Sequence, residues 1–262
     1  MKKKYFFFDI DGTLTDNRTK EIVPSAQQAL LKLQEAGHFV SIATGRAHYK
    51  ARAFMDSVHL HNMVCCGGGA LVVDDVLLYN HPLDLEKAKA IAHEADDLGY
   101  GLLFLLDDSI NLHGKDDLFR QQVGERQEAT NTIINPDLKI DDLTEIYKMY
   151  ISISEADDYK ITLKDTLGNS RFVKDYLMFQ IDAKHQGIMD MMHHLKAPIE
   201  DVVVFGDDYN DMIMFDPRWT SIAMGNACDA LKEKADFVTK SNLDDGIDYA
   251  CKHFNWYDPV NE

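Results

Sequence analysis

The amino-acid sequence predicts an α/β fold, in which a parallel sheet flanked by helices carries an inserted α+β domain. Strand and helix patterns alternate through the first seventy residues, and the same alternation returns after about residue 183. Between these parts the alternation stops. The length of 262 residues suits a core domain with an insertion, and a hydrophobic content of 45% supplies material for a buried core.

The first part of the chain begins with an aromatic run at residues 5–8, which is typical of a strand buried on both faces. A helix is expected over residues 26–36, with Ser25 as its N-cap and Gly37 as its end. The apolar spacing that follows predicts three more elements, in the order strand 39–43, helix 47–58 and strand 63–66.

The last part of the chain repeats this pattern. Its apolar spacing predicts, in order, helix 185–195, strand 202–205, helix 208–215, strand 221–224 and helix 227–234. We therefore assign residues 1–79 and 183–262 to one core domain.

The intervening residues 80–182 form the predicted insertion. The apolar pattern indicates a helix over 85–98, an apolar run over 102–106, a long polar stretch and a strand-like run over 149–154. The sequence at Asp165–Asn169 predicts a turn, with strands on either side of it. This pattern favours an α+β domain built on an antiparallel sheet.

The formal net charge of -17 argues against a nucleic-acid partner, because such binding depends on clustered Lys and Arg. A locally positive pocket can still bind a small anion. The basic start Met1–Lys4 precedes only four apolar residues, too few for a signal peptide, and no apolar run approaches the ~20 residues of a membrane span. We expect a cytoplasmic protein without a membrane partner, and no feature indicates an obligate protein partner.

Two carboxylates follow the first predicted strand. Asp9 and Asp11 lie where it ends, and open α/β sheets bind ligands beyond the carboxyl ends of their strands. One carboxylate can act as a nucleophile while the other transfers a proton, and Gly12 permits the tight turn that follows. An acidic turn without function is the alternative. A calcium loop is disfavoured because its twelfth position would be Lys20.

Three further clusters supply groups for phosphoryl transfer. Thr44 follows the second strand, Lys184 precedes a helix, and the acidic segment Gly206–Asp211 follows a late strand. Alone, such a threonine is most often a helix cap and such a lysine lies on the surface. Two carboxylates cannot approach a phosphate dianion unaided, so a metal that bridges Asp9, Asp207 and the phosphate must cancel the repulsion. Magnesium prefers oxygen ligands of this kind.

The four clusters resemble the four motifs of the haloacid dehalogenase-like (HAD) hydrolases. The matching segments are, in order, Asp9-Ile10-Asp11-Gly12-Thr13, Thr44-Gly45-Arg46, Lys184-His185-Gln186-Gly187 and Gly206–Asp211. The resemblance implies a Rossmann-like HAD core domain whose inserted cap determines substrate specificity. It also implies a reaction that passes through an aspartyl phosphate and needs Mg²⁺.

The resemblance implies a role for each matching residue. Asp9 is the nucleophile, and Asp11 is the general acid and then the base for the attacking water. Further catalytic groups are Thr44 and Lys184. Asp211 acts behind Asp207, through water or by orienting Lys184. The implied phosphate-binding residues are Gly12, Thr44, Gly45, Arg46, Lys184 and Asn210. The implied magnesium ligands are Asp9, Asp11 (through its backbone carbonyl), Asp207 and Asp211.

Two later segments, Ala223–Ala227 and Asn242–Gly246, are similar to the Cof-type branch of the family, which implies a subclass IIB phosphatase. That branch commonly has Asn-Gly at the end of the third strand. This chain has Cys66-Gly67-Gly68-Gly69 instead. We expect an asparagine contact near the substrate to be missing, and the extra glycines to leave more room or flexibility there.

The implied function is magnesium-dependent hydrolysis of a small phosphorylated metabolite, such as a sugar phosphate or a phosphorylated cofactor. Two alternatives stay open. A phosphomutase would need arginines in the cap to hold a second phosphate, and the predicted insertion has only Arg120, Arg126 and Arg171. A non-catalytic phosphate-ester-binding protein would be expected to have lost one of the reacting groups, and none is missing.

Overall fold

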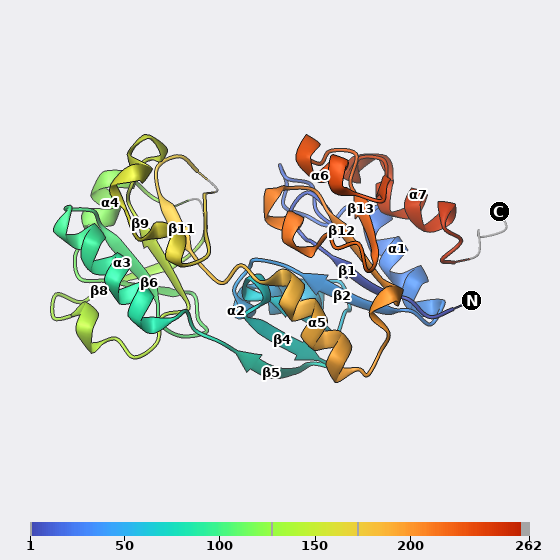
Figure 1. Ribbon diagram of the computed structural model, residues 1–262, viewed down its shortest axis with the longest axis horizontal. Coiled ribbons are helices and arrows are strands. Elements are labelled where there is room, and N and C mark those ends of the chain that lie inside the picture. The colour runs from blue at the N-terminus through green and yellow to red at the C-terminus, as the bar shows by residue number, and fades with distance from the viewer. Residues whose placement is uncertain (1, 127, 172, 258–262) are drawn as a thin grey trace. The chain divides into compact units, whose positions relative to one another are not determined.

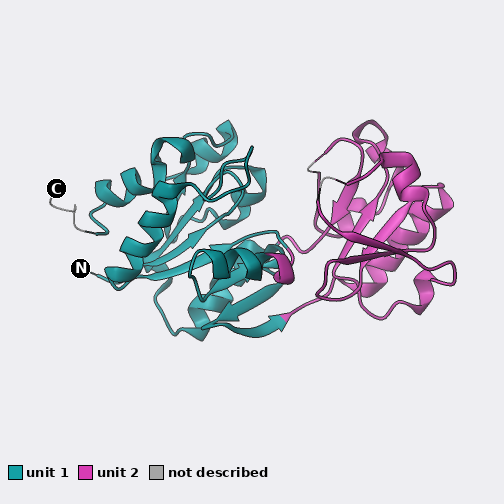
Figure 2. Ribbon diagram, turned by 180° about the vertical axis from the view of Figure 1, so that it is seen from behind, with its two compact units in different colours: residues 1–46, 51–79, 183–262 teal, residues 47–50, 80–182 magenta. Residues whose placement is uncertain are grey.

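The computed structural model (Figure 1) describes residues 2–126, 128–171 and 173–257. The chain forms two compact units, which Figure 2 shows in different colours. Unit 1 comprises residues 1–46, 51–79 and 183–262, and unit 2 comprises residues 47–50 and 80–182. None of the helices in the described part of the chain has the length and apolarity that crossing a bilayer demands.

Unit 1 is built on an eight-stranded sheet. From one edge to the other, its strands are β14 (Phe237–Val238), β13 (Thr220–Ala223), β12 (Val202–Gly206), β1 (Tyr5–Phe8), β2 (Phe39–Ala43), β3 (Met63–Cys65), β4 (Ala70–Val73) and β5 (Val76–Asn80). The strands from β14 to β3 all pair in parallel, and β4 pairs with β3 in the antiparallel direction. The predicted parallel sheet is therefore confirmed.

Helices bury both faces of this sheet. They are α1 (Pro24–Glu35), α2 (His48–Ser57), α5 (Lys184–His194), α6 (Asp229–Lys234) and α7 (Gly246–His253). Apolar residues of α1, α2 and α7 share one core with Phe6 and Phe8, and those of α5 and α6 share a second core with Phe7. All three phenylalanines are fully buried, which stabilises the fold by about 1.5–3 kcal/mol for each side chain. The alternation along β1 thus explains its continuous aromatic sequence.

Two local predictions in unit 1 were wrong. Helix α1 begins at Pro24 with Val23 as its N-cap, so Ser25 lies inside the helix. Proline suits the first helical position because its φ is already helical and it lacks an amide hydrogen that would need a partner. The helix predicted at 208–215 is a 3₁₀ helix, Tyr209–Met214. Over six residues, apolar spacing does not separate the two helix types.

Unit 2 is built on a six-stranded sheet. Its strands, in spatial order, are β10 (Asn169–Ser170), β11 (Leu177–Phe179), β9 (Lys148–Ile151), β6 (Leu102–Leu105), β7 (Asn111–Gly114) and β8 (Asn131–Ile134). All neighbours pair in the antiparallel direction except β7 and β8, which are parallel. Helix α3 (Leu85–Asp97) packs in one core cluster of this sheet, and Phe119 of α4 (Leu118–Val123) belongs to another.

The turn predicted at Asp165–Asn169 has a strand only on its C-terminal side, where β10 begins. Before it, residues Glu155–Lys160 form a 3₁₀ helix in which no side chain is buried. The amides of Thr162 and Leu163 donate to the carboxylate of Glu94 on α3, at 2.9 and 3.1 Å. These amides are therefore satisfied by a helix side chain in place of a neighbouring strand.

Candidate active site

Three of the predicted site residues follow neighbouring parallel strands. Asp9 follows β1, Thr44 follows β2 and Asp207 follows β12, and β1 pairs with both of the other strands. The amide of Asp9 also donates to the carbonyl of Phe205 at 3.0 Å, which continues the pairing of β1 with β12 up to this carboxylate. The parallel sheet therefore brings the first, second and fourth sequence clusters to one edge.

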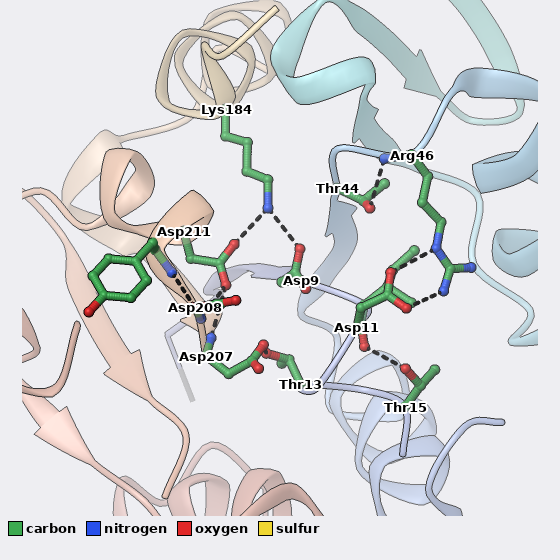
Figure 3. Close-up of polar contacts among 12 residues, drawn as sticks. Asp9, Asp11, Thr13, Thr15, Thr44, Arg46, Lys184, Asp207, Asp208 and Asp211 are labelled. Atoms are coloured by element: carbon green, nitrogen blue, oxygen red, sulfur yellow. Dashed lines mark hydrogen bonds and ion pairs between the residues drawn. The ribbon is translucent and has the colours of Figure 1, made fainter. Parts of the chain in front are cut away.

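Lys184 is the first residue of α5, and its side chain lies among buried carboxylates (Figure 3). Its Nζ donates to Oδ1 of Asp9 at 2.7 Å and to Oδ1 of Asp211 at 2.6 Å. Although burial by itself lowers the pKa of Lys184, the charges of Asp211 and Asp9 outweigh it and raise that pKa above its ordinary value. Lys184 is thus a buried ammonium and not a surface lysine.

Asp9, Asp207 and Asp211 form a buried acidic cluster, with one carboxylate oxygen of each lying within 4.8 Å of the others. Burial raises the pKa of Asp9 to about 7, helped by the charge of Asp211 and opposed by Lys184. Burial, together with the charges of Asp9 and Asp211, raises the pKa of Asp207 to about 8. The single positive charge of Lys184 therefore does not balance the negative charge of the three carboxylates. Hard oxygen donors with this excess of negative charge fit a divalent cation.

Asp211 supports its neighbours through both carboxylate oxygens. While Oδ1 accepts from Lys184, Oδ2 accepts from the amides of Asp207 at 2.9 Å and Asp208 at 3.3 Å. The residue is completely buried. Of the two roles that the resemblance left open for Asp211, the described contacts favour orienting Lys184, and a metal contact through water stays a prediction.

Asp11 and Arg46 form a two-pronged ion pair (Figure 3). Nε of Arg46 donates to Oδ2 of Asp11 at 3.0 Å, and Nη2 donates to Oδ1 at 2.8 Å. The guanidinium also lies over the ring of Phe54, 5.4 Å from its centroid. This planar arrangement fixes the orientation of the Asp11 carboxylate. Arg46, which was predicted to bind phosphate, therefore positions Asp11 in this structure.

Gly12 is required by the close approach of two loops. Its φ is +89°, and a Cβ atom at this position would lie 2.0 Å from Oδ2 of Asp207. The next residue, Thr13, donates its hydroxyl to Oδ1 of Asp207 at 3.0 Å. The tight turn predicted at Gly12 is present, and its main effect is to bring the backbone after β1 against the Asp207 carboxylate.

Two asparagines that sequence reasoning did not select hold this turn in place. Nδ2 of Asn226 donates to the carbonyl of Gly12 at 2.9 Å, and Nδ2 of Asn242 donates to the carbonyl of Thr15 at 2.8 Å. The two are connected, because the amide of Asn242 donates to Oδ1 of Asn226 at 2.9 Å. Both lie in the late segments that resembled the Cof-type branch, which was the available signal.

The remaining predicted phosphate-binding residues lie around the same edge of the sheet. Thr44 is buried, and its Oγ1 accepts a hydrogen bond from the amide of Arg46 at 3.2 Å. Gly45 lies between these two residues in the loop after β2, and Asn210 is half-buried in the 3₁₀ helix that follows Asp208. Thr44 thus shapes its own loop, and its phosphate-binding role stays a prediction.

The glycine run after β3 does not leave the expected room. Gly67 and Gly68 have φ values of +64° and +99°. A Cβ atom on Gly68 would lie 2.1 Å from the carbonyl oxygen of Ala183, so that backbone already fills the space. The expectation of a looser pocket was therefore wrong at this position, because the missing side chain is replaced by a close backbone contact.

Comparison with known proteins agrees with this geometry. The family model of the haloacid dehalogenase-like hydrolases matches residues 6–250, and the chain belongs to this family. Among its relatives, the Bacillus subtilis protein YkrA is 29% identical over 258 residues, covering 96% of this chain and 98% of that protein. The 5-amino-6-(5-phospho-D-ribitylamino)uracil phosphatase YwtE of Bacillus subtilis is 27% identical over 280 residues, covering 94% of this chain and 96% of that protein.

A solved structure gives the subclass. The HAD subclass IIB sugar phosphatase BT4131 matches 97% of this chain and 100% of its own, with a TM-score of 0.79 and 25% identity. The chain is therefore a HAD-superfamily phosphatase of the Cof type, subclass IIB, as its motifs predicted. Phosphatases of this superfamily generally use a divalent metal, which suits the buried aspartate cluster.

Proposed function

We propose that this phosphatase hydrolyses a small phosphorylated metabolite in two steps, through a phosphate ester formed on Asp9, with Mg²⁺ as its divalent cation. The observation that carries the proposal is the position of Asp9. This buried carboxylate directly follows the central strand β1, contacts the Lys184 ammonium at 2.7 Å and lies beside Asp207. An anionic nucleophile can attack an anionic phosphoryl group only where nearby positive charge offsets the repulsion between them.

In the first step, a carboxylate oxygen of Asp9 forms a bond to phosphorus, and the bond from phosphorus to the ester oxygen breaks. The leaving oxygen takes a proton from Asp11, which must be protonated at this stage. Lys184 holds Asp9 and neutralises charge on the transferring group. Thr44 and the backbone after β2 orient that group.

In the second step, Asp11 takes a proton from a water molecule whose oxygen attacks the phosphorus. The bond between phosphorus and Asp9 breaks, so inorganic phosphate leaves and the Asp9 carboxylate is restored. The ion pair with Arg46 stabilises the carboxylate form of Asp11, which is the form that accepts the proton in this step. The pair must loosen when Asp11 is protonated as the acid of the first step. Asp11 is also more exposed than Asp9, which gives it access to water.

When bound, Mg²⁺ would supply positive charge to the phosphoryl oxygens and the nucleophile. The residues that would hold it are the Asp9 and Asp207 carboxylates and the Asp11 backbone carbonyl, with Asp211 behind them. This assignment is supported by the raised pKa values of Asp9 and Asp207, since a cluster that repels its own charges binds a cation readily.

The proposed substrate class is supported by the relatives. YwtE is named for a phosphorylated ribityl-uracil, and BT4131 is a sugar phosphatase. Both names indicate small phosphate esters on polyhydroxylated groups, and we extend that class to this chain. We propose unit 2 as the cap that distinguishes among such substrates, because it is inserted between the second and third motifs.

No contact in the described residues favours the phosphomutase alternative. Each cap arginine is already paired with a carboxylate of unit 2: Arg120 with Asp117 and Glu125, Arg126 with Glu128, and Arg171 with Asp158. A guanidinium that binds a second phosphate would have to leave such a partner. Hydrolysis therefore stays the preferred function.

The proposed function is tested by measuring phosphate release from p-nitrophenyl phosphate and from a panel of sugar phosphates, nucleotides and phosphorylated cofactors, with Mg²⁺ and with chelator. We expect release only with the metal, and the highest kcat/KM for one small polyhydroxylated ester. Full activity in chelator or in Asp9→Asn would refute the mechanism. Isomerised sugar phosphate without phosphate release would favour the phosphomutase.

A further inference from the structure

One residue, Gly67, connects the loop that contains Thr44 to the residue before Lys184. It belongs to the 3₁₀ turn Cys66–Gly68, which we call the glycine turn. The amide of Gly67 donates to the carbonyl of Thr44 at 3.0 Å. The carbonyl of Gly67 accepts from the amide of Ala183 at 2.6 Å. The glycine turn therefore lies between two loops that are far apart in sequence, and it contacts the backbone of both.

The second half of the glycine turn packs against α5 without an intervening side chain. A Cβ atom on Gly68 would lie 2.1 Å from the carbonyl oxygen of Ala183 and 2.8 Å from the amide of Lys184. On the next turn of α5, a Cβ atom on Gly187 would lie 3.1 Å from Cα of Gly68 and 2.4 Å from Cγ1 of Val64. Gly68 in the glycine turn and Gly187 in α5 thus allow the backbone of the turn to contact the start of the helix.

This contact bears directly on the position of the lysine. A side chain at Gly68 would force Ala183 outward by about 1 Å to reach an ordinary separation, and Lys184 is the next residue. The two hydrogen bonds of its Nζ, at 2.7 and 2.6 Å, leave little tolerance for such a displacement. Misplacing a group at a reacting centre by 1 Å lowers the rate by about a hundredfold.

We propose that Gly68 is a positioning residue of the phosphatase reaction. Its missing side chain lets the backbone before Lys184 close on the glycine turn, and this contact fixes Lys184 relative to the Thr44 loop. The inference rests on the proposed function, because its effect is read as phosphate release. It also gives a packing role to part of the glycine run by which this chain departs from the family pattern.

The first test compares Gly68→Ala with the control Gly37→Ala. Gly37 has a similar φ of +84° but no atom within 4 Å of the added Cβ, so both variants carry backbone strain and only one displaces a neighbour. With Mg²⁺ and p-nitrophenyl phosphate, we expect Gly68→Ala to lose about a hundredfold in kcat with little change in KM, because Lys184 acts on the nucleophile. Gly37→Ala should keep kcat. Equal kcat in the two folded variants would overturn the proposal.

A double-mutant cycle decides the matter if Gly68→Ala does not fold. Gly187→Ala should push α5 away from the glycine turn through Val64, and Val64→Ala removes the contacting atom. We expect Gly187→Ala to lower kcat in the unaltered protein. When Gly187→Ala is added to Val64→Ala, the loss of kcat should be smaller by at least about tenfold. Unchanged kcat in Gly187→Ala, or no recovery, would contradict the proposal. If the unaltered enzyme released no phosphate from any ester, the proposed function would fail instead.

Discussion

The metal-free phosphatase should lose stability as the pH rises from 5 to 7. In the folded protein the pKa of Asp9 is about 7 and that of Asp207 about 8, against 3.8 ordinarily. Between these values the folded state binds more protons than the unfolded state, so the free energy of unfolding falls with rising pH. Each carboxyl contributes about 1.4 kcal/mol per pH unit, and the two together about 5 kcal/mol over this range.

The assay is urea unfolding in chelator at pH 5, 6 and 7, followed by tryptophan fluorescence. Trp219 and Trp256 are the only tryptophans and both are buried in unit 1, so the signal reports on the unit that contains the site. Carboxyl groups with a lowered pKa, such as Asp16, titrate below this range. Burial lowers the pKa of His38, which makes stability rise with pH, so the comparison needs a matched variant.

That variant is Asp207→Asn, which removes one of the two titrating groups. We expect its stability to fall less steeply than that of the unaltered protein, by about 1.4 kcal/mol per pH unit. Mg²⁺ should restore more stability at pH 7 than at pH 5, because it binds the deprotonated cluster. Identical slopes in the two proteins would mean that these carboxylates ionise freely without a metal, and the electrostatic reasoning would be refuted.

Two further perturbations test individual contacts of the site. Lys184→Met removes the ammonium that contacts Asp9. In the p-nitrophenyl phosphate assay, kcat should therefore fall by at least about a hundredfold. A loss of less than about threefold would show that this cation does not act on the reaction. Gly12→Ala places a Cβ atom 2.0 Å from Oδ2 of Asp207. The Mg²⁺ affinity measured by calorimetry should therefore fall at least about tenfold relative to the Gly37→Ala control. Equal affinities in the two variants would exclude that steric effect.

Much of the core fold follows from short-range patterns. The run Tyr5–Phe8 predicts a strand buried on both faces, and the structure places its side chains in two separate cores. The hairpin of β4 and β5 was not predicted, although its two-residue turn has a signal. Asp74 and Asp75 both have positive φ, and aspartate tolerates that conformation better than most residues. Exposed apolar residues on β5 weakened the alternation there.

Part of the candidate site could likewise be predicted from the sequence, and part of it could not. Its four clusters were recognisable because each follows a strand or begins a helix, and a parallel sheet brings such positions together. The ion pair between Asp11 and Arg46 was not predictable, since it joins side chains 35 residues apart whose directions depend on the packed loops. The contact of Gly68 with Ala183 could not be predicted for the same reason, and the glycine run was wrongly expected to leave open space.

The most direct measurement concerns the phosphate ester on Asp9. Asp11→Asn removes both the acid of the first step and the base of the second. The p-nitrophenolate ion leaves without needing a proton, so with Mg²⁺ and p-nitrophenyl phosphate the ester should still form, accumulate and be recovered after quenching in acid. Mass spectrometry of the tryptic peptide 5–18 should then find one phosphoryl group on Asp9, labile to hydroxylamine, and none in Asp9→Asn. Phosphate release by the variant without a phosphorylated Asp9, or with the group on another residue, would contradict the assignment of the nucleophile.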